Sequence, residues 1–198
     1  MELVKPDFDG IERAAEALRD GEIVAYPTES VYGLGVDPFN NAALEKLYET
    51  KARDTSNPVL MIVSQPRHMH RLVGSFSDET RKYMKAFWPG PLSMLFPVGA
   101  ELPELLIGPH KKICLRMTSH PVAAGLCTAF GGPITSTSAN RSFENPAQSP
   151  DEIKMEGIAV CIDGGVADST PSTIYDPETG QVLREGAIKR VDLVNASF

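Results

Sequence analysis

The stretch "YPTESVYGLG" (residues 26–35) decides how the rest of the sequence is interpreted. It follows the apolar run "EIVAYP", which we expect to form a short buried strand ending at Pro27, because proline fixes φ and lacks a backbone donor. Thr28 and Ser30 offer hydroxyl groups, and the glycines that close the loop allow the main chain to approach a neighbour closely. Both a turn that satisfies its own hydroxyls and a loop that holds a ligand fit this pattern.

Length and composition predict one α/β domain covering residues 1–198. A chain of 198 residues with 42% hydrophobic and 23% charged residues can bury a sizeable core. The net charge of −7 argues against a protein that coats nucleic acid by bulk attraction. No apolar run is long enough for a membrane helix and no signal peptide is evident, so we expect a cytoplasmic protein without membrane contact. Cys114, Cys127 and Cys161 are expected to be buried, reduced thiols.

Helical and strand patterns alternate in the first half of the chain, and strands crowd near its end. An amphipathic helix is expected from Asp9, as a possible N-cap, to Gly21. The alternation favours an α/β fold with a mixed parallel and antiparallel sheet and flanking helices. Further helices are expected over 41–53, 66–73, 77–87 and 121–130, and further strands within 58–63, 90–98, 111–117, 133–140, 158–165, 172–177 and 181–186.

Two further segments combine cations with short hydroxyl side chains next to strands. In "KARDTSNP", Lys51 and Arg53 precede Thr55, a combination that suits oxyanions such as phosphate or carboxylate. In "STSAN" (136–140), hydroxyls follow a strand, where ligands of open α/β sheets often bind. Cations at a helix C-terminus and a capped strand-to-helix turn explain the same residues without any ligand. Neither a P-loop, a dinucleotide-binding glycine motif nor G-x-S-x-G is present in the sequence.

The order of these segments resembles the YrdC family of threonylcarbamoyl-AMP synthases. The resemblance covers roughly residues 10–188 and is carried by "YPTESVYGLG", "KARDTSNPVLMIV", "WPGPLSMLF", "CLRMTSHP", "STSAN", "PSTIYD" and "LREGAI". It implies a twisted mixed sheet around a large concave cavity. It also implies the synthesis of threonylcarbamoyl-AMP and pyrophosphate from L-threonine, bicarbonate or CO2, and ATP. The chain resembles the short form, without the extra C-terminal domain of longer members.

The resemblance also implies roles for particular residues. Lys51 and Arg53 would be catalytic, because they would face the ATP phosphates. The implied ATP contacts are Lys51, Arg53, Thr55, Lys112, Ser138, Asn140 and Arg184, and the implied threonine contacts are Thr28, Leu60, Arg116, Ser136 and Ser172. Mg2+ would be held by the ATP phosphates rather than by protein side chains. Ser30 stands where the family commonly has Thr, which keeps the hydroxyl.

Two other functions remain open on the sequence alone. One is a YciO-like paralogue with different chemistry, although such proteins lack the full K-x-R and S-T-S-A-N sets that this chain has. The other is a non-catalytic module that binds tRNA or double-stranded RNA. For a synthase, the resemblance implies partner proteins that transfer the threonylcarbamoyl group to tRNA. The polar segment 141–150 is a possible lid over the cavity.

Overall fold

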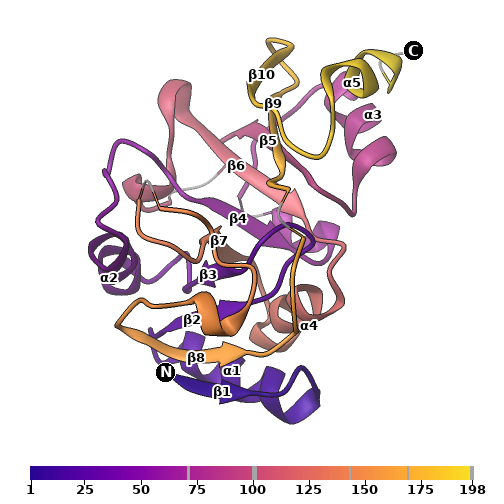
Figure 1. Ribbon diagram of the computed structural model, residues 1–198. Coiled ribbons are helices and arrows are strands. Elements are labelled where there is room, and N and C mark those ends of the chain that lie inside the picture. The colour runs from indigo at the N-terminus through magenta and orange to yellow at the C-terminus, as the bar shows by residue number, and fades with distance from the viewer. Residues whose placement is uncertain (71, 100–101, 143, 169, 197–198) are drawn as a thin grey trace.

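The computed structural model describes residues 1–70, 72–99, 102–142, 144–168 and 170–196 (Figure 1). Its strands are β1 (Glu2–Val4), β2 (Ile23–Tyr26), β3 (Gly33–Gly35), β4 (Leu60–Val63), β5 (Leu92–Pro97), β6 (Lys112–Met117), β7 (Ile134–Ser138), β8 (Ile158–Ile162), β9 (Thr173–Asp176) and β10 (Gln181–Arg184). Its α-helices are α1 (Phe8–Arg19), α2 (Asn41–Lys51), α3 (Asp78–Phe87), α4 (Pro121–Phe130) and α5 (Arg190–Ala196).

The strands form a mixed sheet, as the sequence predicts. The order across the sheet is β1-β8-β2-β3-β7-β4-β6-β5-β9-β10. The pairs β1–β8, β2–β8, β4–β6 and β5–β9 are parallel. The pairs β2–β3, β3–β7, β4–β7, β5–β6 and β9–β10 are antiparallel. The stretch "YDPETGQV" forms the turn of the antiparallel β9–β10 hairpin.

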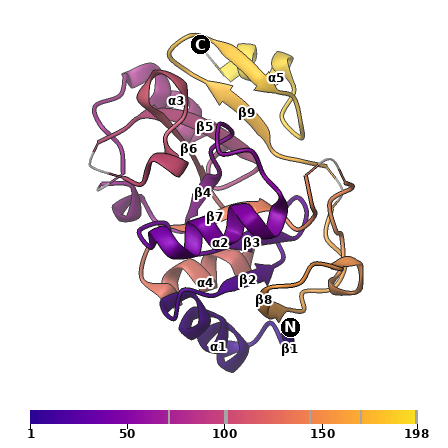
Figure 2. The ribbon, with the colours of Figure 1, turned by 90° about the vertical axis from the view of Figure 1, so that its left-hand side faces the viewer.

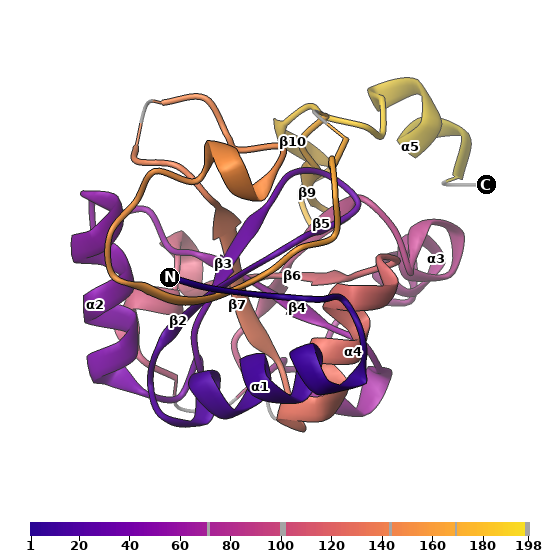
Figure 3. The same cartoon turned by 60° about the horizontal axis from the view of Figure 1, so that its bottom comes forward.

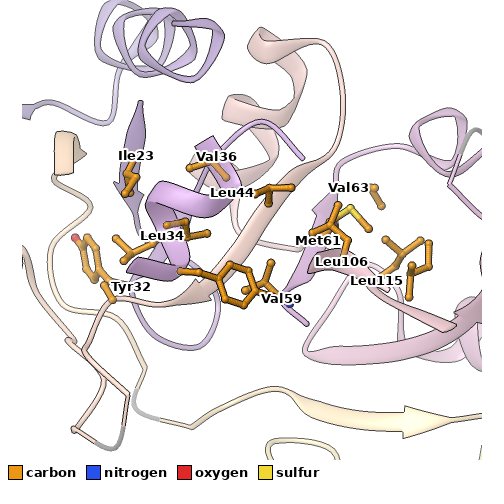
Figure 4. Packing of buried hydrophobic residues seen from close by; sticks show 14 of the residues in the cluster. Ile23, Tyr32, Leu34, Val36, Leu44, Val59, Met61, Val63, Leu106 and Leu115 are labelled. Carbon is orange, nitrogen blue, oxygen red and sulfur yellow. Dashed lines mark hydrogen bonds between the residues drawn. The ribbon is translucent and has the colours of Figure 1, made fainter. Parts of the chain in front are cut away.

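The central strands are buried on both faces, which explains their continuous apolar sequences. In β2, Ile23 and Ala25 belong to one apolar cluster, whereas Val24 and Tyr26 belong to the other. The first cluster continues through Leu34, Leu44 and Met61 towards Leu115 (Figure 4). Side chains of a strand alternate between the two faces of the sheet, so the run "EIVAYP" contributes apolar side chains to both clusters.

Helices cover the two faces unequally. α1 and α4 pack against each other and against the second cluster, on the lower side of the sheet in Figure 3. α2 covers the opposite face near β2 and β3 (Figure 2), and α3 and α5 contact each other near the C-terminal end. Of the helices in the described part of the chain, none combines the length and apolarity needed to cross a bilayer.

Two expected helix details are wrong. The N-cap of α1 is Asp7 rather than Asp9: the Asp7 side chain accepts a hydrogen bond from the Gly10 backbone N–H at 3.0 Å. Residues 66–73 form a 3-10 turn only over Pro66–Met69, and residue 71 lies outside the described residues. The segment with the helical pattern is too short for an α-helix to extend beyond its unfavourable first turn.

The glycines of the opening stretch form a strand, which the sequence analysis does not predict. β3 consists of Gly33–Gly35 and pairs with β2 on one side and β7 on the other. A Cβ atom at Gly35 would lie 2.9 Å from both the Thr135 carbonyl oxygen and the Tyr26 ring. The glycines are therefore needed for close approach between neighbouring strands.

Gly35→Ala is expected to lower the free energy of unfolding by about 1–3 kcal/mol, because the added methyl group forces the neighbouring strands apart. Gly132→Ala is the matched control, because the nearest atom to its Cβ would be 4.0 Å away. The control should change stability by less than about 0.5 kcal/mol. Urea denaturation of the two variants measures the difference, and equal stabilities would contradict the close-approach argument.

Candidate functional site

A pocket of about 470 Å3 lies on the sheet face that α1 and α4 cover in part. Its wall comes from the loop after β2, the segment before β4, β6, the end of β7, and the β9–β10 hairpin. Leu60 joins the two regions, because it lines the pocket and also packs against the α1–α4 cluster. The pocket thus collects side chains that are far apart in the sequence.

Strand alternation explains which residues of β6 face the pocket. Lys112, Cys114 and Arg116 line it, whereas Ile113 and Leu115 point into the first apolar cluster. A strand places alternate side chains on the same face, so the spacing K-x-C-x-R puts two cations in one wall. The apolar residues between them anchor the strand.

Nine of the predicted site residues line this pocket. They come from seven different strands or loops and are Thr28, Arg53, Leu60, Lys112, Arg116, Ser136, Ser138, Ser172 and Arg184. Four of them are cations, and the described lining residues include no Asp or Glu. A wall of this kind suits a ligand that carries several negative charges. The wall itself is a structural finding, whereas the ligand contacts remain predictions.

Arg116 is nearly buried, at 3% exposure, and its charge is balanced inside the protein. Its Nη1 lies 3.3 Å from Glu29 Oε1 and donates to Ser30 Oγ at 3.2 Å. Its Nε has no hydrogen-bond partner within the part of the chain that the structure describes. Burying such a donor without a partner is costly.

Arg184 connects the β9–β10 hairpin to Ser172. Its guanidinium donates to the Ser172 carbonyl oxygen from Nε at 3.1 Å and from Nη2 at 2.9 Å, and Nη2 also reaches Ser172 Oγ at 3.1 Å. Ser172 Oγ is 3.0 Å from Ser93 Oγ. Burial lowers the pKa of Arg184, and neighbouring Arg116 and Arg53 lower it further. Anionic ligand groups would relieve this crowding of positive charge.

Lys112 is held by two carboxylates behind the pocket wall. Its Nζ is 2.8 Å from Asp176 Oδ2 and 2.6 Å from Glu178 Oε2. Burial alone would lower the pKa of Lys112, but the hydrogen bonds to Asp176 and Glu178 raise it above its usual value. The ammonium group therefore stays charged at neutral pH.

Arg53 is fixed by the chain that follows it. Its Nε donates to the Asn57 carbonyl oxygen at 2.8 Å, and its Nη2 donates to the Pro58 carbonyl oxygen at 3.2 Å. Because α2 ends at Lys51 and Ala52 adopts a left-handed conformation, Arg53 turns back towards the start of β4. These contacts leave the guanidinium charge without a carboxylate partner among the described residues.

Three predicted ATP contacts do not line the pocket: Lys51, Thr55 and Asn140. Lys51 is 2% exposed, and its Nζ donates to the carbonyl oxygens of Ser138 and Asn140. Burial lowers the pKa of Lys51 to about 8, with a further contribution from Arg53. Thr55 is exposed on the turn after α2. Their direct contacts with ATP therefore remain predictions.

The "STSAN" segment is fixed at its end by amide hydrogen bonds. Asn140 Nδ2 donates to the carbonyl oxygens of Arg141 at 2.9 Å and Glu144 at 2.7 Å. Pro146, in the segment 141–150 suggested as a lid, lines the pocket. Residue 143 of that segment lies outside the described residues, and a lid motion remains a prediction.

The three cysteines are free, and two of them are buried as expected. Cys114 is only partly buried because it faces the pocket rather than the core. Burial raises the pKa of the Cys114 thiol to about 12. A neutral thiol at this position is a small apolar part of the wall and a poor nucleophile.

The carboxylates behind the wall were missed by the sequence analysis. Glu29, Asp176 and Glu178 each pair with a predicted site cation, but none of the three was assigned a role. Glu29 stands inside the opening stretch, so its position next to the predicted Thr28 was the available signal. No group of three or more His, Cys, Asp or Glu side chains suited to a metal ion occurs within the described ranges.

Comparisons with known proteins show which family of chains this one is similar to. Residues 16–186 match the family model Sua5_yciO_yrdC, described as "Telomere recombination". The chain is 38% identical to a threonylcarbamoyl-AMP synthase of Cellvibrio japonicus over 178 residues, which are 88% of this chain and 94% of the relative. It is 40% identical to a threonylcarbamoyl-AMP synthase of Methylococcus capsulatus over 177 residues, which are 86% and 94% of the two chains.

Two solved structures have the same fold. P. abyssi Sua5 complexed with L-threonine superposes with a TM-score of 0.91 at 28% identity, covering 98% of this chain and 60% of that chain. E. coli YciO superposes with a TM-score of 0.83 at 26% identity, covering 95% and 96%. The fold, the match over most of the length and the identity to the two synthases agree: the chain belongs to the Sua5/YciO/YrdC family.

Proposed function

We propose that this protein is a threonylcarbamoyl-AMP synthase, which joins L-threonine, bicarbonate or CO2, and ATP and releases pyrophosphate. The observation that carries the proposal is the pocket with four cations and several hydroxyls, in a chain 38–40% identical to proteins named threonylcarbamoyl-AMP synthase. All three substrates bring negative charge to one place. A fixed set of cations and hydroxyl donors can stabilise that charge without reorganising during the reaction.

The threonine would bind on the side of the pocket formed by the opening loop and β6. Arg116 would donate hydrogen bonds to the threonine carboxylate, since it lines the pocket and its Nε donor has no partner among the described residues. The hydroxyls of Thr28, Ser136 and Ser172 line the same pocket, and Leu60 supplies apolar surface. The P. abyssi relative was solved with L-threonine, which supports an amino-acid site in this fold.

ATP would bind on the side formed by the segment after α2 and the β9–β10 hairpin. Arg53, Lys112 and Arg184 offer three cations to the phosphates, and Ser138 offers a hydroxyl. Mg2+ would enter with ATP and be held by its phosphate oxygens. Lys51, Thr55 and Asn140 would act near the nucleotide either directly or through the "STSAN" segment.

The chemistry needs no nucleophilic side chain. The threonine ammonium group loses a proton to solvent, the amine attacks CO2 and forms a C–N bond, and a second proton leaves the nitrogen to solvent, which gives the carbamate. A carbamate oxygen then attacks the α-phosphorus of ATP, a P–O bond forms, and the bond to the pyrophosphate leaving group breaks. The protein aligns the reactants, which can contribute on the order of 7–11 kcal/mol to the lowering of the barrier.

The test is pyrophosphate release from ATP and Mg2+, with L-threonine and bicarbonate each supplied and each omitted. Release that requires both substrates supports the synthase. Release without either substrate, or no release under any condition, would contradict it. Mass spectrometry of the product then identifies threonylcarbamoyl-AMP directly.

The likeness to E. coli YciO favours one alternative, a paralogue with different chemistry. The identity to YciO is 26%, against 38–40% to the two synthases, so the synthase is the better-supported function. The same omission experiment separates the two, because a paralogue would not require both threonine and bicarbonate.

The proposal for the synthase pathway also includes transfer of the product to tRNA by partner proteins. It includes any direct contact of this protein with tRNA or double-stranded RNA. Each of these two points needs its own assay.

A further inference from the structure

Glu29 is a partly buried carboxylate that stands behind the pocket wall. Its side chain is 12% exposed and it does not itself line the pocket. One oxygen, Oε2, accepts a hydrogen bond from Thr118 Oγ1 at 2.6 Å. The other oxygen, Oε1, lies 3.3 Å from Arg116 Nη1. The carboxylate therefore bridges two residues near the end of β6.

Thr118 is well placed to fix this carboxylate. It is 3% exposed, and its backbone N–H donates to the Val63 carbonyl oxygen of β4 at 3.1 Å. Its Oγ1 also accepts a hydrogen bond from the His120 backbone N–H at 3.2 Å. The hydroxyl thus receives one hydrogen bond and donates one, which leaves it a single favourable orientation, towards Glu29.

The ion pair engages one end of the Arg116 guanidinium. Nη1 meets Glu29 Oε1 and Ser30 Oγ, and both residues belong to the opening loop. Nε has no hydrogen-bond partner in the described residues, although Arg116 lines the pocket. A guanidinium is a rigid plane, so fixing one nitrogen also fixes the direction of the remaining donors.

We propose that Glu29 is a positioning residue, which holds the guanidinium of Arg116 so that its free donors face a carboxylate in the pocket. This inference rests on the proposed function, because threonine is the carboxylate ligand in question. Without Glu29, the long side chain of Arg116 would lose more conformational entropy when the ligand binds, because its rotamer would become fixed only then. With Glu29, that ordering is complete before binding.

Glu29→Gln tests the proposal. A glutamine amide carries no charge and has one acceptor oxygen, so the ion pair with Arg116 is lost, and Thr118 and Arg116 can no longer both donate to acceptor oxygens of this side chain. The Kd for L-threonine, measured by calorimetry, is expected to rise about 10-fold to 100-fold, as is typical for a lost hydrogen bond to a charged group. The Kd for ATP should change less than about 2-fold, because ATP does not depend on Arg116.

A ligand without the carboxylate separates positioning from general damage. L-Threoninamide should bind the wild-type protein and Glu29→Gln with similar affinity. Glu2→Gln is the matched control, since Glu2 pairs with Arg13 at 3.0 Å on the exposed surface. It should leave all three affinities unchanged. An equal loss for threonine, threoninamide and ATP would overturn the proposal, and so would an unchanged affinity for threonine.

A second pair of variants tests the support from Thr118. Thr118→Val removes the hydroxyl at nearly constant volume, and Thr118→Ser keeps it. The valine variant should weaken threonine binding in the same direction as Glu29→Gln, whereas the serine variant should restore near wild-type affinity. Equal effects of valine and serine would show that packing, not the hydrogen bond to Glu29, determines the affinity.

The Arg116 Nε–H resonance in a 15N NMR spectrum reports the position of the guanidinium without any substrate. Its assignment follows from its disappearance in Arg116→Lys. Glu29→Gln and Thr118→Val should shift or broaden this resonance, and Glu2→Gln should not. If the wild-type protein binds no threonine, the proposed function fails, and the resonance still decides on Glu29: an unchanged signal in Glu29→Gln would overturn the positioning role.

Discussion

Replacing Arg116 by glutamine is expected to abolish measurable threonine-dependent pyrophosphate release and to destabilise the protein at the same time. Arg116 is 3% exposed and is the cation paired with Glu29 at 3.3 Å. Its loss leaves a partly buried carboxylate without a counter-charge, which costs up to about 3 kcal/mol of unfolding free energy. The affinity for threonine should fall by about 30-fold or more, because the partner of its carboxylate is gone.

The double variant Arg116→Gln with Glu29→Gln separates these two effects. Removing both charges eliminates the unpaired, partly buried carboxylate, so much of the lost stability should return. Threonine binding should not return, because the pocket still lacks the guanidinium. Urea denaturation and calorimetry measure the two quantities. If the double variant regained threonine affinity, Arg116 would not be the carboxylate-binding group.

The sequence predicted the fold well where its patterns are local. The burial of β2 on both faces appears in "EIVAYP" as an unbroken apolar run, and the amphipathic helix α1 appears as apolar residues at i, i+3, i+4 and i+7. β3 could not be predicted in this way. Gly33 and Gly35 are strand residues only because β2 and β7 lie on either side of them, and that arrangement depends on the whole sheet.

The site was predicted less completely, for a related physical reason. Arg116 and Lys112 were assigned ligand roles through the resemblance to the YrdC family, in which "CLRMTSHP" is one of the shared segments. The carboxylates that pair with these two cations are far away in the sequence and can be recognised only in the folded structure. Glu29 is 87 residues before Arg116, and Asp176 is 64 residues after Lys112. Charged groups in loops are usually solvated, so a sequence alone gives little reason to place these carboxylates behind a pocket wall.

Lys51 shows how a residue with a predicted ligand role can have a structural one. Its ammonium group donates to the carbonyl oxygens of Ser138 and Asn140, and its own carbonyl oxygen accepts from the Ser142 backbone N–H at 3.0 Å. These contacts join the end of α2 to the segment after β7. Ser138 lines the pocket, so Lys51 can influence ATP binding through the position of that segment.

Lys51→Met is therefore expected to lower the unfolding free energy of the ligand-free protein by about 2–4 kcal/mol and to weaken ATP binding. Methionine keeps most of the apolar stem, but two buried carbonyl oxygens lose their charged donor. If Lys51 contacted only the ATP phosphates, the ligand-free protein would keep its stability or gain some, because a buried ammonium group would have been removed. Urea denaturation without nucleotide distinguishes the two roles.

The pH dependence of this stability difference provides an independent check. Burial lowers the pKa of Lys51 in the folded protein to about 8 from 10.5. Between these two values the unfolded chain binds more protons at Lys51 than the folded protein, so the contribution of Lys51 to stability rises with pH. The advantage of the wild-type protein over Lys51→Met should therefore grow from pH 8 to pH 10.5. The tyrosines and cysteines also titrate in this range, but they do so in both proteins, so their effects on stability cancel in the comparison. If the stability difference between the wild-type protein and Lys51→Met stayed constant across this range, Lys51 would remain fully charged in the folded state.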